Sequence, residues 1–162
     1  MGLTALCPGT FDPVTNGHLD IIVRASRHFE SVVVALLENP AKEPLFGVEE
    51  RIAMLKSAVA DLENVEIDTF SGLLVDFAKK RDNQVIVKGL RAVSDFDYEL
   101  QMAQMNHRLG EVETFFISTS PKWSYLSSSL VREVATYGGD VTGLVPPFVK
   151  DRLAEKLGKG GS

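Results

Sequence analysis

Cysteine and basic residues are both scarce in this chain. Cys7 is its only cysteine, so no internal disulfide can form and a cysteine-rich metal site is excluded. The 17 Lys and Arg residues are outnumbered by 22 Asp and Glu residues, which gives a net charge of −5. A chain with this balance is not expected to bind nucleic acid or an anionic membrane through its overall charge. Any phosphate that it binds must therefore meet basic side chains placed locally.

Long hydrophobic runs and the common nucleotide-binding motifs are absent as well. No apolar segment approaches the ~18 residues of a membrane span, and the first residues lack the charged and apolar regions of a secretory signal. We therefore expect a cytoplasmic protein. Neither G-x-G-x-x-G nor G-x-x-x-x-G-K-[ST] occurs, so the sequence carries neither the usual dinucleotide fingerprint nor a P-loop.

The remaining composition is ordinary for a globular protein. Hydrophobic residues make up 44% of the 162 positions and charged residues 24%. This length fits one domain. We expect that domain to comprise residues 1–157, and the glycine-rich residues 158–162 to form a flexible tail.

Hydrophobic periodicity predicts an alternation of strands and helices. The expected strands are residues 3–7, 31–37, 65–70, 84–87 and 113–119. The expected helices are residues 17–29, 48–62, 73–81, 95–109, 127–137 and 147–157. Such alternation favours right-handed crossovers between parallel strands. We therefore expect an α/β fold, a Rossmann-like doubly wound sheet of five parallel strands flanked by helices.

In such a sheet, ligands bind beyond the carboxyl ends of the strands. Loops after four predicted strands would bring polar side chains or glycine to that edge: Thr10 and His18, Lys42, Ser71 with Gly72, and Lys88 with Arg91. The first turn would also aim free helix N–H groups at a bound anion, and the serines at 127–129 would open a second helix of this kind. A plain connection shaped by Gly and Pro is the alternative interpretation of the first turn.

The helix expected at 95–109 has two apolar stripes on nearly opposite sides. One comprises Phe96, Leu100 and Ala103, and the other Tyr98, Met102, Met105 and Leu109. A surface helix needs only one such stripe. We therefore expect one stripe to face the sheet and the other to be covered by a second subunit, with a helix enclosed in its own domain as the alternative.

Two motifs near the start carry a family resemblance. Gly-Thr-Phe-Asp-Pro (9–13), followed by Thr-x-Gly-His (15–18), resembles the signature of the nucleotidyltransferase superfamily. Within it, five segments have the order and spacing of the bacterial phosphopantetheine adenylyltransferases, and the resemblance extends to about Leu157. These segments are residues 8–13, 88–91, 95–99, 104–106 and 123–129. Two positions differ from many members: Lys88 stands where many have Arg, and Cys7 where some have Tyr.

The resemblance implies an enzyme of coenzyme A biosynthesis. It would reversibly transfer the adenylyl group of ATP to 4′-phosphopantetheine, giving 3′-dephospho-coenzyme A and pyrophosphate, by direct in-line displacement without a covalent intermediate. The implied catalytic residues are Thr10, His18, Lys42 and Arg91. The implied phosphopantetheine-binding residues are Thr10, Lys42, Leu74 and Lys88. The implied ATP-binding residues are Thr10, Phe11, His18, Gly89, Leu90, Arg91, Glu99, Trp123, Ser124, Tyr125, Leu126, Ser127, Ser128 and Ser129.

The resemblance also implies a Mg²⁺ ion that arrives with ATP, without a predicted protein ligand. Asp12 would either reach this ion through water or stabilise the turn. The implied assembly is a homohexamer, and coenzyme A would join dephospho-coenzyme A as a ligand that inhibits. Two other functions stay open: a nucleotidyltransferase for nicotinamide mononucleotide or a cytidylyl acceptor, and a non-catalytic adenine-nucleotide sensor. Residues 88–99 favour phosphopantetheine over the first, and Thr10 with His18 favours catalysis over the second.

Overall fold

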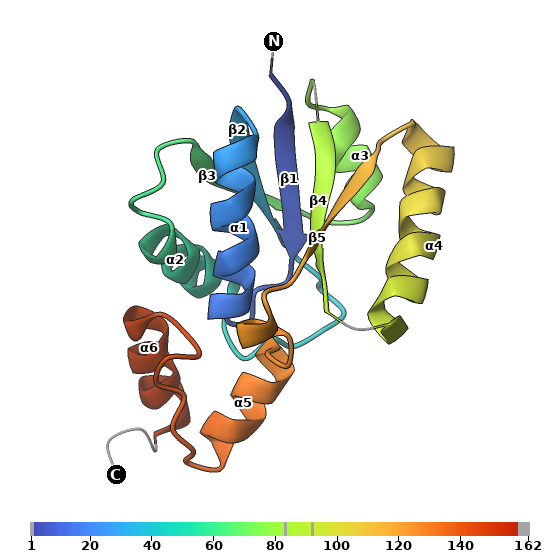
Figure 1. Cartoon of the computed structure of the whole chain (residues 1–162). Coiled ribbons are helices and arrows are strands. Elements are labelled where there is room, and N and C mark those ends of the chain that lie inside the picture. Colours follow the sequence, from blue (N-terminus) through green and yellow to red (C-terminus); the bar gives the residue numbers. More distant parts are fainter. Residues whose placement is uncertain (1, 83, 92, 159–162) are drawn as a thin grey trace.

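The computed structural model describes residues 2–82, 84–91 and 93–158. Its parallel strands form one sheet in the order β3-β2-β1-β4-β5, with helices on both faces (Figure 1). The strands are β1 (Thr4–Gly9), β2 (Ser31–Leu37), β3 (Val65–Phe70), β4 (Gln84–Leu90) and β5 (Thr114–Ser118). The helices are α1 (Asn16–His28), α2 (Val48–Ala58), α3 (Leu74–Lys79), α4 (Val93–Gly110), α5 (Ser128–Thr136) and α6 (Pro147–Leu157), with a 3₁₀ turn η1 (Pro121–Trp123) before α5. The predicted α/β fold is confirmed.

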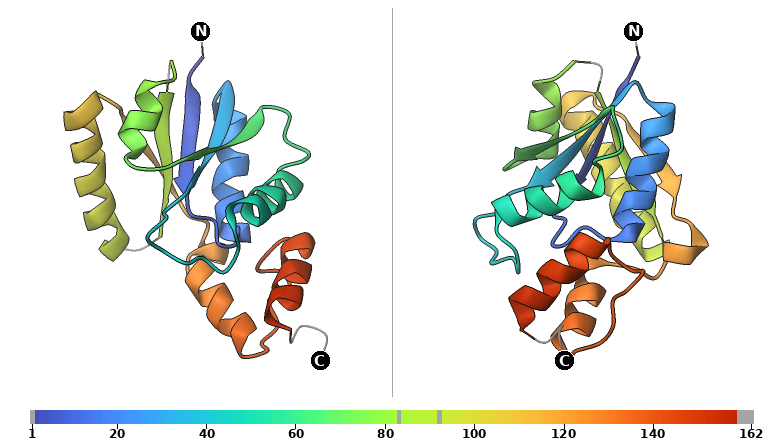
Figure 2. Two further views of the ribbon diagram at one scale, coloured as in Figure 1. Left: turned by 180° about the vertical axis from the view of Figure 1, so that it is seen from behind. Right: turned by 90° about the vertical axis from the view of Figure 1, so that its left-hand side faces the viewer.

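The two faces of the sheet are buried by different helices. Ala5 and Cys7 of β1 belong to the larger hydrophobic cluster, which includes buried side chains of α1 and α2. Leu6, between them, joins a smaller cluster with Val75 and Ala78 of α3. Alternate strand residues point to opposite faces of the sheet. The helices accordingly cover opposite faces: α1 lies in front of the sheet in Figure 1, and α3 lies in front of it in the reverse view of Figure 2. Burial on both faces explains the nearly continuous apolar strands.

β1 lies at the switch point of the sheet, between β2 and β4. It pairs with β2 as far as Gly9, but with β4 only as far as Leu6. β1 therefore continues two residues beyond its predicted end, through Pro8, and the carboxyl ends of β1 and β4 separate. A separation at this point is where open α/β sheets bind ligands.

β4 is three residues longer than predicted. Lys88, Gly89 and Leu90 pair with β5, so they belong to the strand and not to a loop after it. The side chain of Ile21 from α1 packs on Gly89, where an added Cβ would lie 2.9 Å from it. Arg91 then becomes the first residue beyond the strand.

Two helices are shorter than their hydrophobic periodicity predicts. α2 ends at Ala58, and the N–H of Leu62 donates to the Val59 carbonyl in a turn. α3 ends at Lys79 and is followed by similar turn bonds. After α2 the apolar spacing continues because Val59 and Leu62 also pack on the core. The remaining bounds differ from prediction by two residues or fewer, which is the usual uncertainty of helix and strand ends.

The prediction that one stripe of α4 faces the sheet is wrong. Five side chains from both stripes are more than a third exposed: Phe96, Tyr98, Leu100, Met105 and Leu109. The inward side instead carries Asn106, which is buried, and Met102 and Ala103, which are half-buried. The helix packs against α3 and stands beside the β5 edge of the sheet (Figure 1). In the single chain, α4 therefore exposes apolar side chains from both stripes, whereas the prediction had only one stripe exposed.

α5 and α6 lie beyond the carboxyl ends of the strands (Figures 1 and 2). α6 has its predicted bounds, and Gly158 ends it in the left-handed conformation with φ of 66°. The other residues of the predicted tail, 159–162, lie outside the described residues. None of the described helices is long and apolar enough to cross a bilayer.

Candidate active site

His18 is held by the first turn of α1. Thr15 is the N-cap residue, and its hydroxyl accepts a hydrogen bond from the His18 N–H at 3.3 Å. In return, His18 Nδ1 lies 2.9 Å from the Thr15 backbone nitrogen, which donates to it. This is a capping box with histidine in the position usually taken by glutamate. Because a backbone N–H can only donate, Nδ1 accepts and the ring proton is carried by Nε2.

The imidazole of His18 is neutral at physiological pH. Burial, and then the positive charge of Arg91, lower the pKa of His18 from 6.5 to about 4. The Phe11 ring packs edge-on against it with ring centroids 5.0 Å apart. His18 therefore offers the site a hydrogen-bond donor, Nε2–H, and not a full positive charge.

A cavity of about 260 Å³ opens where β1 and β4 separate. Nine of the predicted ATP-binding residues line it: Phe11, His18, Gly89, Arg91, Glu99, Trp123, Leu126, Ser127 and Ser128. Sequence analysis missed other lining residues, among them Thr15, Asp95 and Thr119. Thr15 carried a detectable signal, since a Thr three residues before a polar side chain at a helix start suggests a cap. We refer to this space as the first cavity.

A second cavity of about 260 Å³ lies on the other side of β4. Three of the four predicted phosphopantetheine-binding residues line it, namely Thr10, Leu74 and Lys88. The fourth, Lys42, lines a small hollow of about 40 Å³ together with Thr10. The second cavity also has apolar walls from α4 and the 70–74 segment, including Met102.

The remaining predicted residues do not line these spaces. They are Leu90, Ser124, Tyr125 and Ser129. The carbonyl of Leu90 accepts from the Thr119 N–H at 2.9 Å, and the Ser124 hydroxyl donates to the Pro121 carbonyl at 3.1 Å. Tyr125 is exposed. Leu90 ends β4, Ser124 and Tyr125 lie between η1 and α5, and Ser129 lies in the first turn of α5.

The first and second cavities meet at an ion pair. Lys88 Nζ lies 2.6 Å from Glu99 Oε2, and both residues line both cavities, as does Pro8. The pairing was not anticipated, because Lys88 and Glu99 had been predicted to bind different substrates. An anion that approaches Lys88 must therefore compete with the Glu99 carboxylate.

Arg91 connects three segments around the first cavity. Its Nη1 donates to the Leu126 carbonyl at 2.8 Å, and its Nε lies 3.4 Å from Asp95 at the start of α4. The guanidinium is thereby fixed between the end of β4, α4 and the loop before α5. Because Arg91 also lines the first cavity, its positive charge is held there in a fixed position, which suits binding of an anion.

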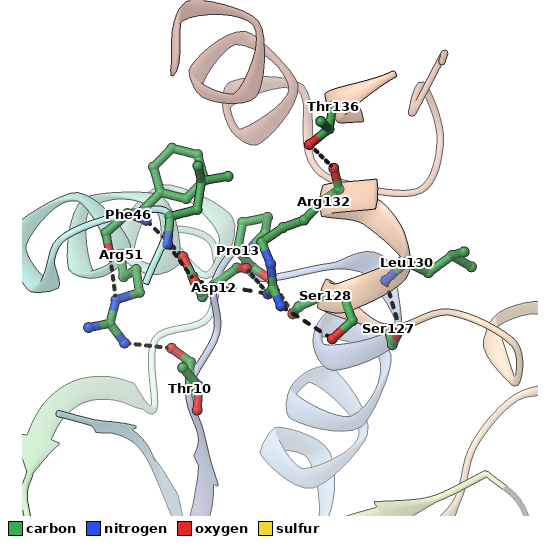
Figure 3. A network of polar contacts seen from close by, with 12 residues as sticks. Thr10, Asp12, Pro13, Phe46, Arg51, Ser127, Ser128, Leu130, Arg132 and Thr136 are labelled. Carbon is green, nitrogen blue, oxygen red and sulfur yellow. Dashed lines mark hydrogen bonds and ion pairs between the residues drawn. The ribbon is translucent and has the colours of Figure 1, made fainter. Parts of the chain in front are cut away.

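Asp12 stabilises the turn and does not extend a free carboxylate. Its two oxygens accept from the N–H groups of Leu45 and Phe46, each at 2.9 Å, and the side chain is buried. Arg132 of α5 donates to the Asp12 carbonyl at 2.6 Å (Figure 3). This geometry supports the structural alternative for Asp12, because both oxygens are already used.

Arg51, also drawn in Figure 3, was not anticipated as part of the site. It lies within α2, where an arginine among apolar residues usually points to solvent. Here its side chain is buried and donates to main-chain carbonyls, including that of Thr10 at 2.9 Å. No signal in the sequence distinguishes it from the exposed arginines of the chain.

Cys7 lines the first cavity, but its thiol is unreactive. Burial raises the pKa of its thiol to about 12, so the thiolate is scarce at neutral pH. Since the thiolate is the nucleophilic form of cysteine, Cys7 is not suited to covalent catalysis.

The comparisons with known proteins identify the family. Residues 6–134 match the cytidylyltransferase-like family model. A phosphopantetheine adenylyltransferase of Streptomyces coelicolor is 61% identical over 153 residues, which cover 94% of this chain and 96% of that protein. One of Frankia casuarinae is 60% identical over 157 residues, which cover 94% and 97%.

Solved structures share the fold at much lower identity. A Vibrio parahaemolyticus protein described as a nicotinate-nucleotide adenylyltransferase has a TM-score of 0.69 and 17% identity, covering 99% of this chain and 97% of that one. A bifunctional NMN adenylyltransferase/ADP ribose pyrophosphatase of Francisella tularensis has a TM-score of 0.71 and 17% identity, covering 99% of this chain and 50% of that one. These likenesses concern the fold alone. The high identity over nearly the whole length confirms the predicted relationship: the chain belongs to the phosphopantetheine adenylyltransferases, nucleotidyltransferases of the cytidylyltransferase-like family.

Proposed function

We propose that the protein transfers the adenylyl group of ATP to 4′-phosphopantetheine, releasing pyrophosphate and forming 3′-dephospho-coenzyme A. The family supports this activity. The observation that carries it is the pair of cavities that meet at Pro8, Lys88 and Glu99. One cavity suits the nucleotide and the other, with its partly apolar walls, suits the acceptor. The reaction centre then lies at their junction, near His18 and Thr10.

The acceptor needs no general base. A phosphate monoester has a second pKa of ≈ 6 and is largely dianionic at neutral pH. One of its oxygens attacks the α-phosphorus of ATP as the bond to the bridging oxygen breaks, and that electron pair leaves with pyrophosphate. Catalysis then consists of alignment and of stabilising charge in the transition state. The neutral His18 and the protonated Cys7 agree with this, since neither is poised to accept a proton or to form a covalent intermediate.

Each proposed catalytic residue has a distinct task. His18 donates Nε2–H to an oxygen of the α-phosphate, and Arg91 contributes fixed positive charge on the same side. Thr10 and Lys42 orient the acceptor phosphate from the end of β1 and the 38–47 loop. The first turns of α1 and α5 reach the first cavity with Gly17 and Ser128, and the positive end of a helix favours phosphate binding.

Lys88 has a task on both sides of the junction. We infer that the acceptor phosphate draws Lys88 away from Glu99, which is then free to interact with ATP as the family resemblance implies. A lysine makes this exchange through a single flexible ammonium group, without the planar grip of an arginine.

We propose that Mg²⁺ enters with ATP. Among the described residues, no group of three His, Cys, Asp or Glu side chains could hold a metal ion. Asp95 and Glu99 line the first cavity, but each lies beside a cation, Arg91 and Lys88. This donor set suits an ion that takes its ligands from phosphates and water. Bound in that way, Mg²⁺ would neutralise charge on the phosphates of ATP.

We further propose that the chain assembles as a homohexamer. The family resemblance suggests the number of subunits, and the exposed apolar side chains of α4 support association. Fully burying a large apolar side chain is worth ≈ 1.5–3 kcal/mol before the costs of ordering. We also propose that coenzyme A inhibits the enzyme as a product analogue, and that the enzyme acts in the cytoplasm, where its substrate ATP is available.

A pyrophosphate-release assay tests the proposed reaction. The protein is incubated with ATP and Mg²⁺ and with 4′-phosphopantetheine, nicotinamide mononucleotide or no acceptor, and a parallel series contains CTP. Pyrophosphate should appear with ATP and phosphopantetheine together, along with dephospho-coenzyme A detected by mass spectrometry. Turnover with nicotinamide mononucleotide instead, or ATP binding without turnover, would overturn the proposal.

A further inference from the structure

Arg51 is a buried cation without a carboxylate partner. Its side chain is 3% exposed, and among the residues that the structure describes no ion pair neutralises it. Three hydrogen bonds to main-chain carbonyls replace the lost water: Nε donates to Phe46 at 3.0 Å, and Nη1 donates to Thr10 at 2.9 Å and Leu37 at 3.2 Å. Arginine cannot shed its charge by deprotonation in a protein, and a buried unpaired charge is costly. Arg51 therefore keeps a full positive charge in the interior of the protein.

The three carbonyls belong to segments that form the acceptor side of the site. Thr10 follows the end of β1, Leu37 is the last residue of β2, and Phe46 lies at the end of the loop that carries Lys42. Figure 3 shows the guanidinium reaching from α2 toward Thr10. One side chain therefore fixes the relative positions of both segments that carry Thr10 and Lys42.

Asp12 holds the same loop from the opposite direction. It accepts from the N–H groups of Leu45 and Phe46, so the Phe46 residue is bound at its N–H by Asp12 and at its carbonyl by Arg51. This end of the 38–47 loop is thereby fixed on both sides. The fixed end limits where Lys42 can reach.

Arg51 also borders the hollow shared by Thr10 and Lys42. That hollow has a volume of about 40 Å³, room for little more than a phosphate oxygen or a few water molecules. It shares Thr10 and Leu37 with the second cavity and no residue with the first. The cations of Lys42 and Arg51 and the hydroxyl of Thr10 therefore line a hollow that adjoins the second cavity, on the acceptor side, and not the first cavity.

We propose that Arg51 is a positioning residue for the acceptor phosphate. By binding three carbonyls it makes Thr10 and Lys42 converge on one anion, and its uncompensated charge raises the affinity for that anion. This inference rests on the proposed function, because it names part of the machinery that binds phosphopantetheine. A small displacement of positioning groups can cost about 10²-fold in rate.

Two Arg51 variants separate geometry from charge. Arg51→Lys keeps the charge but cannot donate to three carbonyls in the same planar arrangement, and Arg51→Met removes the charge. We expect Arg51→Lys to raise the KM for phosphopantetheine by about tenfold and Arg51→Met to raise it further, while the KM for ATP changes less than about twofold. Calorimetry with phosphopantetheine and with a non-hydrolysable ATP analogue gives the binding affinities directly.

Arg81→Lys is the matched control. Arg81 is paired with Glu66 and Asp68 near the amino ends of the strands, away from the carboxyl edge. We expect this variant to lose some thermal stability and to keep both KM values. Equal weakening of both substrates by Arg51→Lys, in proportion to lost stability, would show a merely structural role and overturn the inference. Unchanged binding of phosphopantetheine would overturn it as well.

Asp12→Asn keeps the inference testable if the Arg51 variants do not fold. Asparagine offers one acceptor oxygen and an NH₂ group, so one of the two loop N–H groups loses its partner. The same selective loss of phosphopantetheine affinity is expected, and an equal loss for both substrates would refute the idea.

The outcomes distinguish this inference from the proposed function. A wild-type protein that fails to turn over phosphopantetheine refutes the proposed function, whereas an active wild type with unselective variants refutes only the role of Arg51.

Discussion

Replacing His18 by Asn should separate the two hydrogen bonds that its imidazole ring provides. In the structure, Nδ1 accepts from the Thr15 N–H and leaves Nε2–H to face the first cavity. Asn carries a carbonyl oxygen about where Nδ1 lies, whereas Leu carries neither an acceptor nor a donor. His18→Asn therefore keeps the acceptor of the helix cap and loses the donor, and His18→Leu loses both.

Loss of the donor should affect turnover, and loss of the cap should affect stability, so different assays measure them. Removing one transition-state donor typically costs ~10²–10³-fold in kcat, so His18→Asn should lose most turnover while its ATP affinity and melting temperature stay near wild type. His18→Leu should lose turnover to a similar extent and, in addition, about 1 kcal/mol of stability with the cap. Pyrophosphate release and urea denaturation measure these quantities. If His18→Asn turns over like the wild type, His18 does not act as the donor that we describe.

The pH dependence of the same residue provides an independent check. The pKa of His18 is lowered to about 4 in the folded protein from 6.5. Any break near pH 6.5 in kcat/KM for ATP should therefore come from the phosphates of the substrates and persist in His18→Asn. Between these two values the unfolded chain binds the additional proton, so stability falls as the pH is lowered through this window. The difference corresponds to about 3 kcal/mol when fully expressed. A wild-type break near pH 6.5 that is absent in His18→Asn would contradict burial of a neutral ring.

Three further predictions concern the acceptor, the assembly and the thiol. Lys88→Ala should weaken phosphopantetheine binding more than ATP binding in calorimetry, and Lys88→Arg should be tolerated because the family resemblance includes both residues; equal acceptor affinity in wild type and Lys88→Ala would exclude this role. Met105→Lys should lower both oligomer mass and activity, because a charge at a buried interface loses hydration without gaining a partner; sedimentation of the wild type as one 17.7 kDa species would contradict it. Cys7, with a pKa raised to about 12, should resist iodoacetamide at pH 8 in the native protein, as followed by mass spectrometry; rapid stoichiometric labelling would show an accessible thiolate.

The fold was predictable because its signals are local. A β-branched run such as residues 31–37 fits a strand buried on both faces, and β2 has those bounds. A proline at the first helical position and a glycine after the last one likewise gave the bounds of α6. The order of such segments then limits the topology to few arrangements. Contacts between distant segments have no such local signal in the sequence. For α4, the periodicity therefore predicted a helix but not which of its sides packs on α3.

The electrostatics of the site depend on such contacts between distant segments. The sequence supplies several positive or titratable side chains at the carboxyl edge, but their net effect depends on what each one touches. His18 is neutral, Lys88 is paired with a carboxylate of α4, and Arg91 lies beside another. Among the described residues, Lys42 and Arg51 have no such carboxylate partner. The uncompensated positive charge therefore lies on the proposed acceptor side of the junction, where a dianionic phosphate would be held against the repulsion of ATP. Composition does not reveal this asymmetry, because nothing in the sequence of α2 distinguishes the buried Arg51 from an exposed arginine.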